Sequence, residues 1–230
     1  MKIFATSDTH GMLGGLDPSG CDVVVIAGDF AKLNRLDRFG LLDQKKWVED
    51  VFIPWTRDYP EIEFAVVPGN HDMIFDMSKT GLFGDADSSV EFPDNVHLLV
   101  NGGVEIGGVK FWGTPNVPII NHRWAFESCG VELVDRFDRI PSGIDVLITH
   151  SPPRIEGESI DASLQYGGTE FFGSKELTAA IRDRNPRFVF CGHIHSGSHE
   201  PCKLGPSTIY NVSRVDESYR IAYPPTVVEL

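Results

Sequence analysis

Five short apolar runs limit most strongly what this chain of 230 residues can fold into. They cover residues 3–5, 23–27, 64–67, 146–148 and 188–190. Each run is rich in β-branched or aromatic residues. None shows the alternation of polar and apolar residues that is typical of a strand with one solvent-exposed face. That pattern is typical of strands buried on both faces. The five runs therefore predict strands that need cover from helices or from a second sheet.

Weaker signals complete the expected sheets. Further strands are expected at residues 96–100, 104–106, 109–113 and 208–211. Gly107 and Gly108 separate the second and third of these, which is a hairpin signal. So many strands, alternating with helical segments, predict an α/β fold with two packed sheets and outer helices.

Two stretches show clear helical patterns. Residues 44–55 place one apolar stripe on a helix, and Pro54 is expected to end or kink its last turn. The stripe consists of Trp47, Val48, Val51, Phe52 and Trp55. Residues 174–184 form a second expected helix, with Ser174 as its N-cap.

Composition bounds the class of protein. The formal net charge is −13, which disfavours nucleic acid and anionic membrane as partners. The four cysteines form no CxxC pair, and the N-terminal apolar run is too short for a signal peptide. We therefore expect a cytoplasmic protein. Because no linker or repeat interrupts the chain, residues 1–230 are expected to form a single domain.

Each of the five buried runs ends in Asp, Asn or His. The residues at these ends are Asp8, His10, Asp29, Asn70, His71, Asp72, His150, His193 and His195. One such ending is a weak signal because turns and caps prefer the same residues. Five endings together are more specific, since ligands collect beyond the carboxyl ends of strands in α/β sheets. We expect these side chains to share one crevice.

Such a crevice predicts a metal site. Many polar groups are costly to bury together unless they are paired or bind a metal. Carboxylate and imidazole ligands together suit Mn, Fe or Zn better than Mg or Ca. The number of candidate ligands exceeds the four of a single zinc, so we expect two metals that share a bridging carboxylate.

In their order along the chain, the motifs DxH, GD, GNHD, TH and GHxH resemble the calcineurin-like metallophosphoesterase superfamily. This resemblance implies a four-layer α/β/β/α sandwich and a binuclear metal site. Carried over by residue, one metal is held by Asp8, His10, Asp29 and His195. The other is held by Asn70, His150, His193 and the same Asp29, which bridges the two. His71 corresponds to a general acid or a phosphate-contacting residue, and Asp72 to the residue that orients it.

Segments between these motifs are similar to the metallophosphoesterase-domain (MPPED) family, which itself resembles class III cyclic-nucleotide phosphodiesterases. They are Thr6-Ser7-Asp8-Thr9-His10, Ala27-Gly28-Asp29-Phe30, Gly113-Thr114-Pro115 and His150-Ser151-Pro152-Pro153. The resemblance implies phosphodiester hydrolysis and, in some members, purine nucleotide binding. His193, which feebly active members lack, is present. Asn116 and Thr169 depart from the family pattern, which affects substrate contacts rather than metal ligands.

The expected reaction is hydrolysis of a phosphate ester by a hydroxide that bridges two metals about 3.5–4 Å apart. Manganese is the expected metal in vitro. A diesterase on small nucleotides is the leading hypothesis. A phosphomonoesterase or protein phosphatase on the same site, and a nucleotide-binding regulator with little turnover, remain alternatives. A nuclease is disfavoured because the chain has no basic stripe.

Substrate contacts are expected outside the metal motifs. A polar and aromatic loop after a predicted strand suits a base or a phosphate, although packing against the surface explains it equally well. Its candidates are Asn116, Asn121, His122, Arg123 and Trp124. Arg154 follows the His150 motif and could reach a phosphate or remain in solvent. Residues 166–168 are a candidate wall of the site.

Overall fold

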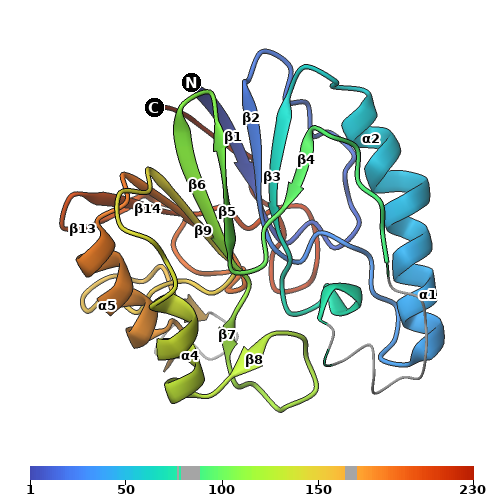
Figure 1. Ribbon diagram of the computed structural model, residues 1–230. Helices are drawn as coiled ribbons and strands as arrows, with labels where there is room; N and C mark the ends of the chain where they lie inside the picture. Colours follow the sequence, from blue (N-terminus) through green and yellow to red (C-terminus); the bar gives the residue numbers. More distant parts are fainter. Residues whose placement is uncertain (77, 79–88, 164–169) are drawn as a thin grey trace.

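Two mixed sheets form the centre of the molecule. The computed structural model describes residues 1–76, 78, 89–163 and 170–230. Figure 1 shows the sheets side by side, with α1 and α2 on one side and α4 and α5 on the other. The first sheet has the order β15 (Thr226–Glu229), β1 (Lys2–Thr6), β2 (Val23–Ala27), β3 (Glu63–Val67) and β4 (Val96–Leu98). This arrangement confirms the predicted four-layer α/β/β/α sandwich.

The second sheet is longer by one strand. Its order is β13 (Cys202–Leu204), β14 (Ser207–Asn211), β12 (Phe188–Cys191), β9 (Val146–Thr149), β6 (Val109–Thr114) and β5 (Gly102–Ile106). Gly107 and Gly108 join β5 to β6 with φ values of +55° and +81°, as a two-residue hairpin turn requires. The predicted hairpin is confirmed.

The buried strands pack on both faces, as their unalternating sequences predict. In β1, Phe4 faces the core under α1 and α2, whereas Ile3 and Ala5 face the core between the sheets. Phe111, Ile148 and Phe190 reach the same central core from the second sheet. A one-residue shift in register would exchange these two apolar faces.

The first helical layer runs through an irregular turn. The helix α1 (Arg38–Trp47) continues into a π-helical segment, Val48–Phe52, and then into α2 (Ile53–Arg57). Proline cannot donate to the carbonyl four residues earlier and clashes with it, and a wider turn before Pro54 relieves both problems. The helix therefore continues past Pro54, beyond its predicted end. The wider turn also moves Val51 out of the predicted stripe, to 41% exposure.

The second helical layer covers the other sheet. It consists of α4 (Gly130–Phe137) and α5 (Lys175–Arg184), which contribute Leu133, Leu177 and Ile181 to a third core cluster. The Ser174 side chain accepts a hydrogen bond of 3.1 Å from the Leu177 amide, which confirms the predicted N-cap. Within the described residues, none of the helices combines the length and apolarity needed to cross a bilayer.

Several short elements lie outside the predicted strands. They are β13, β15, the pair β7 (Val117–Pro118) with β8 (Glu127–Ser128), and the pair β10 (Ala162–Ser163) with β11 (Glu170–Phe171). The strand predicted at residues 96–100 ends at Leu98. These elements lack long runs of β-branched residues. They are recognised as strands only from the segments with which they pair in the folded chain.

Candidate metal centre

The carboxyl ends of five strands meet at one place between the two sheets. The amide of Asp8, after β1, donates a 2.9 Å hydrogen bond to the Gly28 carbonyl after β2. The amide of His193, after β12, donates to both carboxylate oxygens of Asp8, at 3.2 and 3.1 Å. Backbone contacts thus hold the strand-end segments of both sheets together before any ligand is considered.

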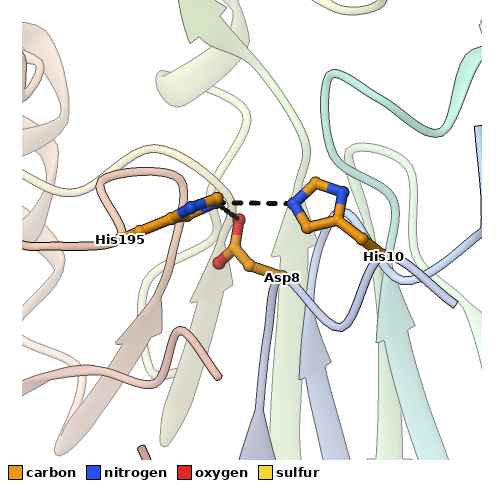
Figure 2. Close-up of side chains that lie close together, drawn as sticks. All are labelled: Asp8, His10 and His195. Carbon is orange, nitrogen blue, oxygen red and sulfur yellow. Dashed lines mark hydrogen bonds and ion pairs between the residues drawn. The ribbon is translucent and has the colours of Figure 1, made fainter. Parts of the chain in front are cut away.

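Asp8, His10 and His195 form the first group of converging side chains. Figure 2 shows His10 and His195 extending toward one another across Asp8. Their Nε2 atoms lie 3.4 Å apart, and His195 Nε2 lies 3.3 Å from Asp8 Oδ1. The other Asp8 oxygen accepts hydrogen bonds from the hydroxyls of Ser7 and Ser213. The two serines orient Asp8 so that Oδ1 faces the imidazoles.

Asp29 and His150 form a second group, with Asn70 beside them. His150 Nε2 lies 3.3 Å from Asp29 Oδ2 and 2.9 Å from Asn70 Oδ1. On its other side, His150 Nδ1 lies 2.9 Å from the Ala27 carbonyl, and His195 Nδ1 lies 3.2 Å from the Asp216 carbonyl. A carbonyl accepts only from N–H, so both rings carry the Nδ1 proton, and Nε2 is the nitrogen that can bind a metal once it is deprotonated.

Asp29 takes part in more than one group. Its carboxylate converges with Asp8 and His150, and also with His10 and His71. His71 Nε2 lies 4.0 Å from Asp29 Oδ2, and the His71 amide donates to Asp29 Oδ1 at 2.7 Å. This central place suits a carboxylate that bridges two ions.

His193 lies beside the second group rather than within it. Its ring centroid is 5.0 Å from that of His150, edge to face. Burial lowers the pKa of His193 to about 3 and that of His10 to about 4, so both rings are neutral at pH 7 and have a lone pair available. Burial opposes a proton on His150 as well, but the charge of Asp29 outweighs it and raises the His150 pKa to about 9.

The backbone around these groups is unusually bent. Four of the candidate ligands have left-handed φ values: Asp8 (+51°), His10 (+44°), Asp29 (+51°) and His193 (+70°). Gly69 approaches Asp29 so closely that a Cβ at this position would lie 2.2 Å from Asp29 Oδ1. The bends aim nitrogen and oxygen donors at common points, and this donor set fits Mn, Fe or Zn.

The Asp72 carboxylate contacts backbone amides rather than the His71 ring. Its carboxylate accepts hydrogen bonds from the amides of Phe30, Ala31 and Gly69, at 3.3, 2.8 and 2.7 Å. In the part of the chain that the structure describes, no hydrogen bond joins it to the His71 ring. Asp72 therefore ties the segments after β2 and β3 together, next to His71 in the chain.

Trp124 is the candidate substrate residue that lies next to the metal groups. Its ring stacks on that of His71, with centroids 4.3 Å apart and planes 30° apart. Both rings line a hollow of about 430 Å³, named here the His10 hollow. The other lining residues are His10, Met12, Lys32, Leu33, Asn34, Arg35, Leu36 and Tyr219.

The loop that carries Trp124 is held by one carboxylate. Glu127 Oε1 accepts from the amides of Ile120, Asn121 and His122, at 2.6, 2.7 and 3.1 Å. Its Oε2 accepts from the Trp124 amide at 2.9 Å. His122 itself is exposed and does not line the His10 hollow.

Two other substrate candidates lie elsewhere. Asn116 is buried, and its amide group donates to Ser128 Oγ at 3.1 Å. Arg154 pairs with Asp161 at 3.2 Å and lies over the Phe171 ring at 3.8 Å. It lines a separate hollow with Lys175 and Arg182. Neither residue lines the His10 hollow, and their roles in binding a base or a phosphate stay predictions. Residues 166–169 lie outside the described residues.

The sequence interpretation missed three residues near the metal groups. Tyr219 packs edge-on against His10 and His195, with centroids 4.7 and 5.3 Å away. Its turn, residues 216–220, has no motif. Lys32 follows a predicted strand end, so its place in the sequence could have identified it. Ser213 could not be identified in this way, because it lies far along the chain from Asp8, whose carboxylate it contacts.

Comparisons with known proteins agree with this geometry. A family model described as Calcineurin-like phosphoesterase matches residues 1–197. Metallophosphoesterase domain-containing protein 1 of Homo sapiens is 28% identical over 247 residues, which cover 100% of this chain and 71% of the human protein. UPF0046 protein K07C11.7 of Caenorhabditis elegans is 29% identical, over 99% of this chain and 74% of the worm protein.

Solved structures share the fold at low sequence identity. The protein TT1561 of Thermus thermophilus has a TM-score of 0.58 at 14% identity, covering 91% of this chain and 88% of its own. Phosphopantetheinyl hydrolase from Mycobacterium tuberculosis has a TM-score of 0.54 at 16% identity, covering 97% and 96%. At these identities the likeness extends to the fold alone.

Proposed function

This chain belongs to the calcineurin-like phosphoesterase family, and from that premise we propose that it is a metal-dependent phosphodiesterase that hydrolyses small nucleotide-type esters. The carboxylate of Asp29, shared between groups of imidazoles and carboxylates, carries the proposal. We also propose that residues 1–230 act as one domain, because β15 and Tyr219, which lie beyond the family match, complete the first sheet and the His10 hollow.

Two divalent ions are the cofactors in this proposal, with manganese as the metal expected in vitro. One would be held by Asp8, His10 and His195, the other by Asn70, His150 and His193, with Asp29 shared by both. When bound, such ions supply an activated water molecule and neutralise charge on the phosphate. They would also add positive charge for a phosphate in a chain whose formal net charge is −13.

His71 is the proposed catalytic residue of the chain itself. It belongs to the group with His10 and Asp29, and its side chain retains 19% exposure toward the His10 hollow. Burial lowers the pKa of His71, so the resting ring is neutral and donates one N–H. A bound phosphate raises the pKa of a nearby imidazole. His71 is thereby suited to hydrogen-bond the phosphate or to pass a proton to the leaving oxygen.

The proposed preference for nucleotides rests on the walls of the His10 hollow. Trp124 and Tyr219 offer ring faces and edges beside the metal groups, and a purine or pyrimidine packs favourably on such rings. A cavity of about 430 Å³ is within the range that holds a small ligand. The negative charge of the chain disfavours long nucleic acids, and its four free cysteines fit a reducing cytoplasm.

The test is metal analysis of the purified protein together with a substrate panel at fixed Mn²⁺. The panel contains bis-p-nitrophenyl phosphate, p-nitrophenyl phosphate, 2′,3′- and 3′,5′-cyclic nucleotides, and single-stranded DNA. Two metals per chain and preferential cleavage of the small diesters are expected. Preferential cleavage of p-nitrophenyl phosphate would make the protein a monoesterase. Tight nucleotide binding without hydrolysis under any metal would make it a regulator.

The panel needs a control variant that distinguishes loss of the metal centre from general loss of the folded protein. His97→Ala serves this purpose, because His97 binds Glu63 at 2.7 Å between β4 and β3 and belongs to none of the metal groups found among the described residues. Asp29→Ala removes the shared carboxylate instead. Activity lost in both variants alike would count against a specific role for the metal centre.

A further inference from the structure

A cationic wall borders the His10 hollow. It is formed by the segment that follows the Asp29 motif and includes Lys32 and Arg35. The formal charge of the chain is −13. Two positive side chains beside one hollow therefore contrast with the net negative charge of the protein. The hollow also contains His10 and His71, which places this wall next to the metal groups.

Lys32 is held in place by close contact between two strand-end segments. The amides of His10 and Gly11 donate to the carbonyls of Asp29 and Phe30, each at 2.9 Å. Gly11 has a φ of +88°, and a Cβ added there would lie 2.7 Å from the Cβ of Lys32. Only glycine permits both this φ and this approach. The backbone of Lys32 is therefore fixed directly beside the segment that carries His10.

The two cations of the wall differ in their partners. Arg35 Nε pairs with Asp37 at 2.9 Å, and its guanidinium lies 4.8 Å from the Phe39 ring centroid. Lys32 is exposed, and its ammonium makes no hydrogen bond or ion pair with any residue that the structure describes. An ammonium without a partner, at the edge of a ligand-sized hollow, is available to an anionic group of a ligand.

We propose that Lys32 binds a second phosphate of the substrate, so that the site selects nucleotides with another phosphate group besides the one at the metals. This inference rests on the proposed function, since it assigns the first phosphate to the metal groups. Two divalent ions and His71 would engage the phosphate at the metal groups. None of the described residues that line the His10 hollow is acidic, and Lys32 offers a second phosphate a positive charge at the edge of the same hollow.

The test compares AMP and ADP as inhibitors of bis-p-nitrophenyl phosphate hydrolysis at a fixed free Mn²⁺ concentration. ADP is expected to inhibit up to about fivefold more strongly than AMP, the largest ratio that one exposed ion pair usually supplies. In Lys32→Gln the two inhibition constants become equal. In Lys32→Arg, which keeps the charge, the preference for ADP remains. Added salt weakens the preference in the unmodified protein.

Lys175→Gln is the matched control, because Lys175 lies at the separate hollow that contains Arg154. It is expected to retain the preference for ADP. Equal inhibition by AMP and ADP in the unmodified protein, or none by either, would overturn the proposal. So would a preference that survives in Lys32→Gln or disappears in Lys175→Gln. The rate of bis-p-nitrophenyl phosphate hydrolysis without inhibitor tests the proposed function separately from the inhibition constants of AMP and ADP.

Discussion

The indole of Trp124 stacks on the imidazole of His71 at a centroid distance of 4.3 Å. The contact joins the aromatic wall of the His10 hollow to the proposed proton donor. It depends on a loop with little regular structure, whose four amides converge on the Glu127 carboxylate. Glu127, an acidic residue that no family motif contains, therefore holds the loop that places Trp124 against His71.

Glu127→Gln is expected to raise KM for bis-p-nitrophenyl phosphate more than it lowers kcat. A glutamine replaces one accepting oxygen by an NH₂ group, which leaves amides of the loop without a partner. The expected effect is about 1 kcal/mol, or about fivefold in KM. Steady-state kinetics at pH 7 measures it. Glu132→Gln is the control, because Glu132 accepts an amide hydrogen bond at the start of α4. Equal changes in both variants would contradict the coupling.

His71→Ala is expected to cut turnover while both metals remain bound. The loss should be about 10²–10⁴-fold, the usual contribution of a positioned acid or base. Elemental analysis and kcat on the same preparation test this. If the variant loses metal in proportion to its activity, His71 is a ligand rather than a catalytic residue. This outcome is an alternative because His71 forms a group with His10 and Asp29.

Asp29→Ala is expected to empty both metal positions, because its carboxylate converges with groups on either side. Native mass spectrometry counts the ions per chain. His97→Ala, measured alongside, should keep its full metal content. A variant at Asp29 that holds one ion and retains full activity would refute the shared role.

Metal binding is expected to weaken as the pH falls from about 9. In the metal-free protein the His150 pKa is raised to about 9, so the ring is protonated at pH 7 and must lose that proton to become a ligand. Affinity should fall about tenfold per pH unit for each proton displaced. The proton also stabilises the metal-free fold fully below pH 6.5, and this stabilisation disappears as the pH rises through 9. Calorimetry in buffers of different ionisation enthalpy would reveal the released proton, and its absence would contradict the assignment.

Gly69→Ala is expected to destabilise the protein by about 1–3 kcal/mol and to weaken metal binding. The added Cβ would lie within 2.4 Å of the Asp29 amide nitrogen and within 2.7 Å of His150 Cε1. Thermal unfolding with and without Mn²⁺ measures both effects. Gly14→Ala is the control, because nothing lies within 4 Å of its added Cβ. Equal melting temperatures for the two variants would show that the site can yield to the extra atom.

The strands and metal candidates could be predicted because their signals are local. A buried strand such as β2 is a run of β-branched residues, and each strand ends in the residue that carries the chemistry. Ser213 and Tyr219 were not predicted because they meet the metal groups through packing between distant segments, whereas Lys32 was missed although it follows a predicted strand end. The contacts of Asp72 with buried amides and the pairing of Arg154 with Asp161 were also not predicted, because they depend on how the chain packs around these residues.

The left-handed backbone at Asp8, His10, Asp29 and His193 has a consequence for how this sequence could change. Such conformations cost about 1–3 kcal/mol each in residues other than glycine. Glycine would relieve that cost at any of the four positions and would remove a candidate ligand at the same time. A chain selected only for thermal stability would therefore drift toward an inert protein with the same fold. The strain at these four positions is therefore a cost in stability that accompanies the candidate ligands.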